Sequence, residues 1–117
     1  MRHGIIDNVI SSIDPGNIPT DVLVEKILTV TAKHYGVRVE DIKSKSKTDN
    51  IANARHVSVY VIKKITDLSY KAIGAFLGGR DHSTVISSYN KIDRDISTKK
   101  NLDSDIKKII KEVKAQS

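Results

Sequence analysis

The apolar positions of this chain recur at intervals of three and four residues over most of its length. Residues 20–35 and 51–68 each carry two adjacent stripes of apolar side chains at this spacing, which is typical of a helix that buries a wide face. Thr20 is a suitable N-cap for the first helix, and Gly36 is a natural stop after it. We therefore predict two long helices over these ranges, with room for one short helical turn at residues 37–42.

The next part of the chain predicts a pair of helices joined by a tight turn. Ser69 can cap a short helix over residues 70–77, and the Gly78-Gly79 pair ends it, with one glycine in a left-handed conformation. Asp81 or Ser83 can cap a longer helix after the turn. The inner face of this longer helix is apolar and its outer face is polar, which predicts that it packs on one side and meets solvent or a partner on the other.

One break divides the chain. Residues 14–19, Asp-Pro-Gly-Asn-Ile-Pro, combine two prolines with a glycine, which stop helices and favour turns. Residues 1–18 are therefore expected to be an N-terminal segment, a linker or the tail of a preceding module, with a short helix at residues 4–13. Residues 19–117 are expected to form one domain, closed by a last helix with apolar positions between 102 and 113. Every predicted element is helical, so the predicted fold class is all-α.

Composition and charge narrow the class of protein. The 117 residues suffice for one compact core, and the absence of cysteine excludes disulfides and thiolate metal sites. No apolar run is long enough to span a membrane, and the N-terminus does not read as a signal peptide. Residues 1–40 carry four basic and five acidic side chains, whereas residues 41–117 carry sixteen and nine. This excess indicates either an ordinary lysine-rich surface or a surface for a polyanion, nucleic acid before membrane.

The densest group of chemically versatile residues is IGAFLGGRDHSTV, residues 73–85. A phosphate-binding Walker loop needs lysine and then Ser or Thr directly after its second glycine, and Arg80-Asp81 stands there instead. Asp81, His82 and Ser83 have the residue types of a hydrolytic triad, but neighbouring helix residues point about 100° apart and cannot form that relay. No ligand-type residue follows at a suitable spacing for a metal site. Nucleotide hydrolysis, triad catalysis and metal binding are therefore disfavoured.

DNA reading fits the layout better. A short helix, a tight turn and a longer helix with a polar outer face follow the order of a helix-turn-helix, whose second helix contacts bases with its N-terminal residues. Asp81, His82 and Ser83 occupy that end, and their donors and acceptors suit base edges. Lys45 and Lys47, in a flexible loop, can reach a phosphate backbone or a narrow minor groove. The alternative from the residues alone is that Asp81 is only an N-cap and the glycines only a helix stop.

The same string resembles the signature of the C-terminal DNA-binding domain of the bacterial chromosomal replication initiator, DnaA. The family pattern runs roughly I-G-x-x-F-G-G-R-D-H-[ST]-T-V, which Ile73-Gly74 and the stretch Gly78 to Val85 match. Leu77 stands where the family usually has Phe. The resemblance covers roughly residues 19–115.

The resemblance implies a compact, TrpR-like multi-helix domain built around the helix-turn-helix. It implies double-stranded DNA as the partner, at short asymmetric origin sites similar to TTATNCACA that are called DnaA boxes, and a monomeric reader in the bacterial cytoplasm at the nucleoid. ATP belongs to a module of the full-length family proteins that these residues lack, so neither a cofactor nor enzymatic activity is expected in this chain. Regulatory proteins are possible partners, and the alternatives are a stand-alone DnaA-like regulator of boxes or a protein-interaction module.

Residue by residue, the resemblance places Asp81, His82 and Ser83 on base edges in the major groove. It places Lys47, with Lys45 in the same loop, at the adjacent minor groove. Phosphate or groove-wall contacts are expected from Thr84, Ser87, Arg55, His56, Lys63, Tyr70, Lys71 and Arg80.

Three further positions of this chain depart from the family pattern. Lys47 replaces the usual Arg, Asp49 replaces a basic residue, and His56 replaces a usual Gln. The change at Lys47 loses the planar fork of arginine and keeps the charge. For Arg80, phosphate contact and internal bracing of the turn are equal alternatives.

Overall fold

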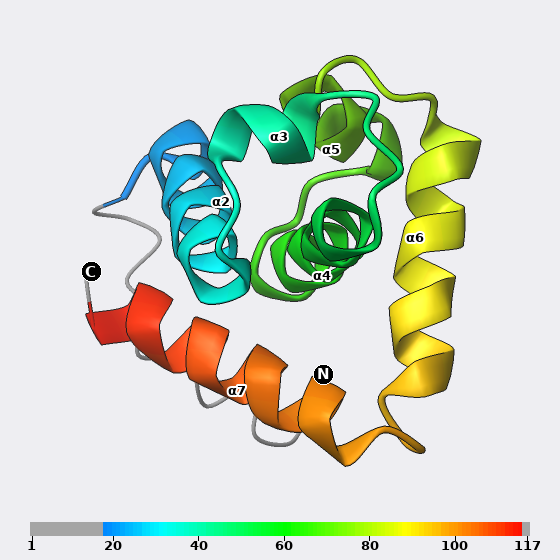
Figure 1. Ribbon diagram of the computed structural model, residues 1–117. Helices are drawn as coiled ribbons and strands as arrows, with labels where there is room; N and C mark the ends of the chain where they lie inside the picture. Colours follow the sequence, from blue (N-terminus) through cyan, green and yellow to red (C-terminus); the bar gives the residue numbers. More distant parts are fainter. Residues whose placement is uncertain (1–17, 116–117) are drawn as a thin grey trace.

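Six helices make up the part of the chain that the structure describes, residues 18–115, and no strand occurs among these residues (Figure 1). This computed structural model confirms the predicted all-α class, whereas the expected short helix at residues 4–13 lies outside the described residues. The helices are α2 (Thr20–Tyr35), α3 (Val39–Lys43), α4 (Asp49–Ile65), α5 (Tyr70–Phe76), α6 (His82–Asp95) and α7 (Lys100–Ala115).

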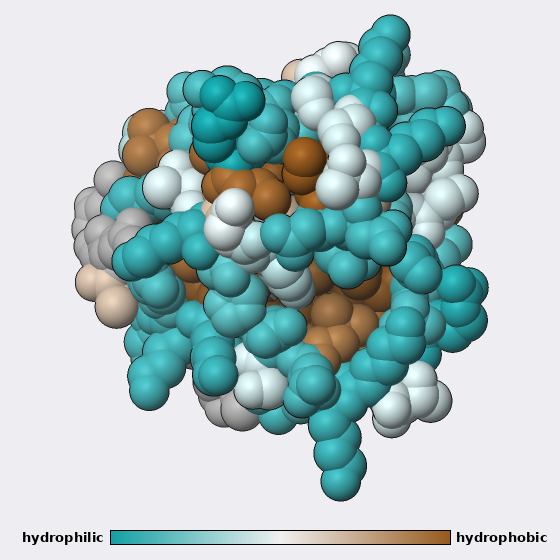
Figure 2. Space-filling model, in the orientation of Figure 1, coloured by the Kyte–Doolittle hydropathy of each residue, from teal (hydrophilic) through white to brown (hydrophobic). Residues whose placement is uncertain are grey.

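Helix α4 is the centre of the domain, with α2, α3, α5, α6 and α7 arranged around it (Figure 1). Its residues Val57, Val61 and Ile62 are at most 1% exposed. Burying such side chains contributes about 1.5–3 kcal/mol each, which outweighs the weak helix propensity of a segment rich in β-branched residues. The face drawn in Figure 2 is mostly hydrophilic, with apolar side chains visible in a few patches.

Several helix ends differ in detail from the predictions, and the structure explains two of them. Thr20 is the first helical residue and not the N-cap, because Pro19 takes the cap position and its carbonyl accepts the Leu23 N–H at 3.0 Å. The long central helix ends at Ile65, three residues before the predicted end. Thr66 is responsible for that end, since its backbone is extended and its hydroxyl donates to the Ile62 carbonyl at 2.7 Å.

The α5–α6 pair forms the predicted helix-turn-helix. Ser69 caps α5 as predicted, since its hydroxyl oxygen accepts the Ala72 N–H at 3.1 Å. The Gly74 carbonyl then accepts three N–H groups of the turn, from Leu77, Gly79 and Arg80, at 2.9–3.1 Å. These bonds close α5 and direct the chain into α6.

Candidate nucleic-acid interface

The N-terminal end of α6 presents three polar side chains to solvent. Asp81 is the N-cap, as predicted, and its carboxylate accepts the Ser83 N–H at 3.2 Å as well as the Ser83 hydroxyl. The hydrogen bond from the Ser83 side chain is the main cause of a pKa of Asp81 below its usual value. The His82 Nδ1 lies 3.7 Å from Asp81 Oδ1, and both side chains remain about two-thirds exposed, at 63% and 64%.

The rest of α6 continues this division into two faces. Thr84 and Ser87 are exposed beside Ser83, whereas Val85 is fully buried and Ile92 is 3% exposed. A helix anchored on one side and lined with short hydroxyl side chains on the other offers a narrow polar ridge. Short side chains let the backbone of such a ridge approach a partner closely.

Beside this ridge lies a hollow of about 540 Å³, which we call the basic groove. The basic loop (residues 43–48, from the end of α3 to the start of α4) forms one wall, and the α5–α6 turn forms the other. No carboxylate side chain is among its lining residues, and a cleft lined by one sign of charge concentrates its field. The lining residues are Lys43, Lys45, Lys47, Ala52, Arg55, His56, Gly78, Gly79, Arg80, Thr84 and Ser88.

Arg55 is buried at the base of this groove, with 7% of its surface exposed. Its Nε donates to the Ile42 carbonyl at 2.8 Å and its Nη1 to the Ser46 carbonyl at 2.9 Å. Its Nη2 donates to the carbonyls of Ser44 and Asp41, at 2.9 and 3.2 Å. A guanidinium has five N–H donors, so little of Arg55 remains free. Arg55 therefore holds the basic loop in place, and its predicted phosphate contact stays a prediction.

Arg80 leaves the α5–α6 turn and reaches the same loop. Its Nη1 donates to the Leu77 carbonyl at 2.5 Å and lies 3.4 Å from the Lys43 carbonyl, and its Nη2 donates to the Ser44 carbonyl. Burial lowers the pKa of Arg80 from its usual value, although a guanidinium stays protonated. Of the two alternatives for this residue, internal bracing is the one that the structure contains.

The basic loop is more ordered than the flexible loop predicted from its composition. The Ser44 hydroxyl donates to the Asp41 carbonyl at 2.6 Å, and the Ser46 hydroxyl donates to Thr48 Oγ1 at 3.2 Å. Lys45 and Lys47 are both exposed. The loop therefore holds its backbone against the domain and directs two lysines outward.

His56 links the groove to α6. Its Nδ1 lies 2.8 Å from the Ser88 hydroxyl, which sequence reasoning missed although Ser88 follows Thr84 by one helical turn. Burial lowers the pKa of His56, and the positive charges of Lys91, Arg55 and Arg80 lower it further. The imidazole is therefore neutral near pH 7 and can act as a hydrogen-bonding group in the groove wall.

Three other predicted contact residues lie outside the lining of the groove. Lys63 Nζ lies 4.5 Å from the centre of the Tyr70 ring and donates to the Leu68 carbonyl at 3.1 Å. Lys71 is exposed on the next residue of α5. These residues gather at the start of α5, so a partner must extend past the groove to reach them.

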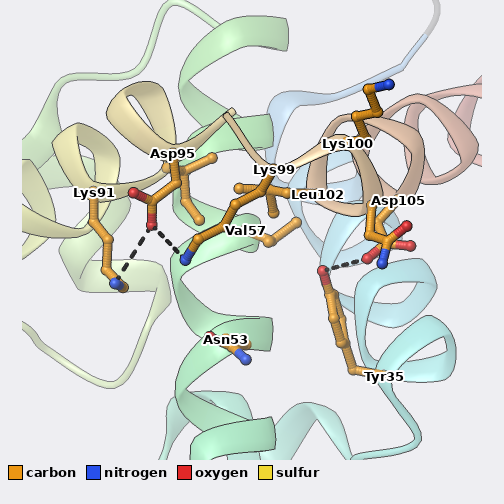
Figure 3. Close-up of a pocket in the computed structure, with 11 residues that line it drawn as sticks. Tyr35, Asn53, Val57, Lys91, Asp95, Lys99, Lys100, Leu102 and Asp105 are labelled. Carbon is orange, nitrogen blue, oxygen red and sulfur yellow. Dashed lines mark hydrogen bonds and ion pairs between the residues drawn. The ribbon is translucent and has the colours of Figure 1, made fainter. Parts of the chain in front are cut away.

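A second hollow, of about 470 Å³, lies between α2, α4, α6 and α7 (Figure 3). Asp95 Oδ2 lies 3.5 Å from Lys91 Nζ and 3.3 Å from Lys99 Nζ. The Tyr35 hydroxyl donates to Asp105 at 3.5 Å, and burial together with this carboxylate raises the pKa of Tyr35 to about 12. Cations and carboxylates neutralise each other here, so this hollow lacks the one-sided charge of the basic groove.

Within residues 18–115, no three His, Asp or Glu side chains are grouped closely enough to hold a metal ion. None of the described helices has the length and apolar character needed to cross a bilayer.

An exposed polar helix end after a tight glycine turn, beside an acid-free basic groove, defines a nucleic-acid-binding domain of the helix-turn-helix class. Residues 24–92 match the family described as the bacterial dnaA protein helix-turn-helix. The chain is 42% identical over 95 residues to a chromosomal replication initiator protein DnaA from Streptococcus pyogenes serotype M4 (strain MGAS10750), an alignment that covers 81% of this chain. The chain therefore belongs to the DnaA helix-turn-helix family, and it spans about a fifth (21%) of the length of that relative.

Proposed function

We propose that this domain binds double-stranded DNA sequence-specifically, at DnaA-box sites of a replication origin, and so contributes origin recognition to replication initiation. The proposal rests on two features that lie side by side. Three exposed side chains suited to base edges, those of Asp81, His82 and Ser83, stand beside an acid-free basic groove. Membership of the DnaA helix-turn-helix family supports DNA binding in general, and the preference for boxes is the finer step proposed here.

The two parts of this surface divide the work. In a protein–DNA complex, phosphate contacts supply affinity and position, and base contacts supply specificity. We assign base contacts in the major groove to the end of α6. Asp81 accepts from cytosine N4, and His82 and Ser83 each donate or accept. Asp81 keeps this acceptor capacity because a carboxylate has about four lone-pair sites, of which Ser83 occupies two.

The basic loop serves the second part of the surface. Lys45 and Lys47 are exposed on a wall of the groove, opposite the turn that precedes α6. When α6 enters a major groove, lysines at this distance along the surface meet the flanking backbone and the adjacent minor groove, where the potential is most negative. Phosphate or groove-wall contacts from Thr84, Ser87, His56, Lys63, Tyr70 and Lys71 extend the footprint on both sides of α6.

The proposed reader is a monomer that needs no cofactor of its own. A single recognition helix beside a single loop has no two-fold symmetry, and such a unit suits an asymmetric site better than a palindrome. ATP binding is assigned to other modules of full-length DnaA proteins, and the expected location is the bacterial nucleoid. In this proposal the domain acts by binding DNA alone, and any enzymatic step is carried out by other modules.

A titration with two duplexes tests this proposal. One duplex carries a DnaA box and the other carries the same bases in scrambled order, and both are titrated over a series of salt concentrations. We expect the box to bind more tightly at every salt concentration, with both affinities falling as salt rises. Equal affinities for the two duplexes throughout the series would reject box recognition and leave only general polyanion binding or a protein-interaction role.

A further inference from the structure

Residues from two other parts of the chain meet on the backbone of the basic loop. Arg55 comes from α4, and Arg80 and Gly78 come from the α5–α6 turn. The Ser44 carbonyl is the shared point, because it accepts from Nη2 of both arginines. Taken together, the two guanidiniums donate to the carbonyls of Asp41, Ile42, Lys43, Ser44, Ser46 and Leu77.

Carbonyl groups, and not carboxylates, compensate this pair of charges. Among the described residues, neither arginine has an ion pair with Asp or Glu, although Arg80 is close enough for its charge to lower the pKa of Arg55. Leaving two cations side by side in a partly buried place is costly unless each is well hydrogen-bonded. The planar fork of a guanidinium can fix several carbonyls at once, which an ammonium cannot do. The arrangement therefore specifies one path for the loop backbone.

Gly78 adds a direct backbone contact between the turn and the loop. Its φ is +80°, and a Cβ at this position would lie 2.3 Å from the Lys43 carbonyl oxygen. Gly79 has the same φ of +80°, but a Cβ there would meet nothing within 4 Å. The two glycines therefore share a backbone conformation that disfavours other residues, and only Gly78 is also required for the approach of the loop.

We propose that Arg55, Arg80 and Gly78 are positioning residues that lock the basic loop to the helix-turn-helix, so that Lys47 and α6 meet DNA as one rigid unit. This inference rests on the proposed function, since it concerns how that surface is assembled. It assigns no direct DNA contact to either arginine. Its consequence is that an uncharged substitution in the turn removes the contribution of a charged residue in the loop.

The matched pair Gly78→Ala and Gly79→Ala tests this consequence. The quantity measured is the magnitude of the slope of the logarithm of the binding constant against the logarithm of the salt concentration, on box and scrambled duplexes alike. Lys47→Ala should lower this slope by roughly one. Gly78→Ala should lower it by a similar amount without changing any charge, whereas Gly79→Ala, which carries the same backbone strain without the close contact to the loop, should lower it less. Adding Lys47→Ala to Gly78→Ala should change the slope no further, because the lysine is already displaced.

Arg80→Lys provides a second variant that keeps the charge. It should lower the slope as Gly78→Ala does, because a lysine cannot hold the Ser44 and Lys43 carbonyls together. Thermal unfolding followed by circular dichroism identifies any variant that has lost its fold, and slopes are compared only among folded variants. If Gly78→Ala becomes unfolded, Arg80→Lys decides the question by the same slope.

Two results would overturn the inference: equal slopes for the two alanine variants, or additive losses when Gly78→Ala and Lys47→Ala are combined. The proposed function fails differently, by equal affinity for box and scrambled duplexes. A protein without box preference in which Gly78→Ala still lowers the slope would keep this inference and lose the proposed function.

Discussion

Two regions of this domain are rich in positive charge, and they are built differently. The exposed lysines of α7 share their helix with three acids, and Lys107 Nζ lies 2.9 Å from Asp103. Another of these three acids, Glu112, lies 3.5 Å from Lys33 of α2. In the basic groove, by contrast, no acid lines the hollow, although Lys43 at its edge lies 3.2 Å from Glu25. Two guanidiniums there are fixed by backbone carbonyls.

Under the proposed function, the number of basic residues does not by itself mark a DNA surface. The lysines of α7 lie on the exposed side of an amphipathic helix whose apolar residues, such as Ile106 and Val113, are buried. Such a face suits solvation. The groove instead concentrates charge in a shaped hollow next to the exposed end of α6. We therefore expect that substitutions of the same kind change DNA binding differently in the two regions.

The largest expected effect, on stability, comes from removing a buried side chain beneath each of the two regions. Leu77→Ala, under the turn, and Ile110→Ala, under α7, each remove a side chain that is at most 2% exposed, and each should cost about 2–5 kcal/mol of unfolding free energy. Urea unfolding measures both costs. At a temperature where both variants remain folded, Leu77→Ala should also weaken box binding, whereas Ile110→Ala should not. Equal binding losses would mean that the turn has no special share in the surface.

A smaller effect, on DNA binding, is expected when charges are removed from the two surfaces. The double variant Lys45→Ala/Lys47→Ala should weaken binding to box and scrambled duplexes and lower the salt slope by about two. The charge-matched control Lys108→Ala/Lys111→Ala, on exposed positions of α7, should leave the slope near that of the wild type. Fluorescence anisotropy over a salt series measures both. If the α7 variant loses as much slope as the loop variant, the contrast between the two regions is wrong.

The smallest expected effect is a pH dependence of stability that arises from His56 in the groove. The pKa of His56 is lowered in the folded state, chiefly by burial and then by nearby cations. The unfolded chain therefore binds a proton at His56 more readily, so stability is full above about pH 6.5 and falls as the pH drops below it. His56→Gln should remove this part of the decline. Urea unfolding between pH 5 and pH 7.5 measures it, and an identical decline in the variant would assign the effect to other groups.

Much of the scaffold was predictable because local chemistry determines it. The apolar stripes marked the helices, Ser69 and Asp81 act as the predicted caps, and the Gly78-Gly79 pair forms the predicted turn. Both glycines, and not one, are left-handed. The exposed positions of Asp81, His82 and Ser83 also followed from the apolar pattern of this helix, since Val85 and Ile92 mark its buried face.

The basic groove was less predictable, because its contacts join distant parts of the chain. Arg55 bonds to carbonyls of residues 41–46, and Arg80 bonds to a carbonyl 36 positions away. Backbone carbonyls have no signature in a sequence, so the family resemblance suggested a phosphate contact for Arg55, and phosphate contact and internal bracing stayed equal alternatives for Arg80. Ser88 was missed for a similar reason, since its hydrogen-bond partner His56 lies on another helix.

In the proposed complex, the end of α6 reads bases while the basic groove holds the DNA backbone. The ratio of the dissociation constants for scrambled and box duplexes tests it most directly, measured for the wild type, for His82→Ala and for Asn101→Ala, an exposed control at the start of α7. The account predicts a clear preference for the box in the wild type and the control, and a loss of about 1–3 kcal/mol of that preference in His82→Ala, with an unchanged salt slope. An unchanged ratio in His82→Ala, or a ratio of one in the wild type, would contradict it.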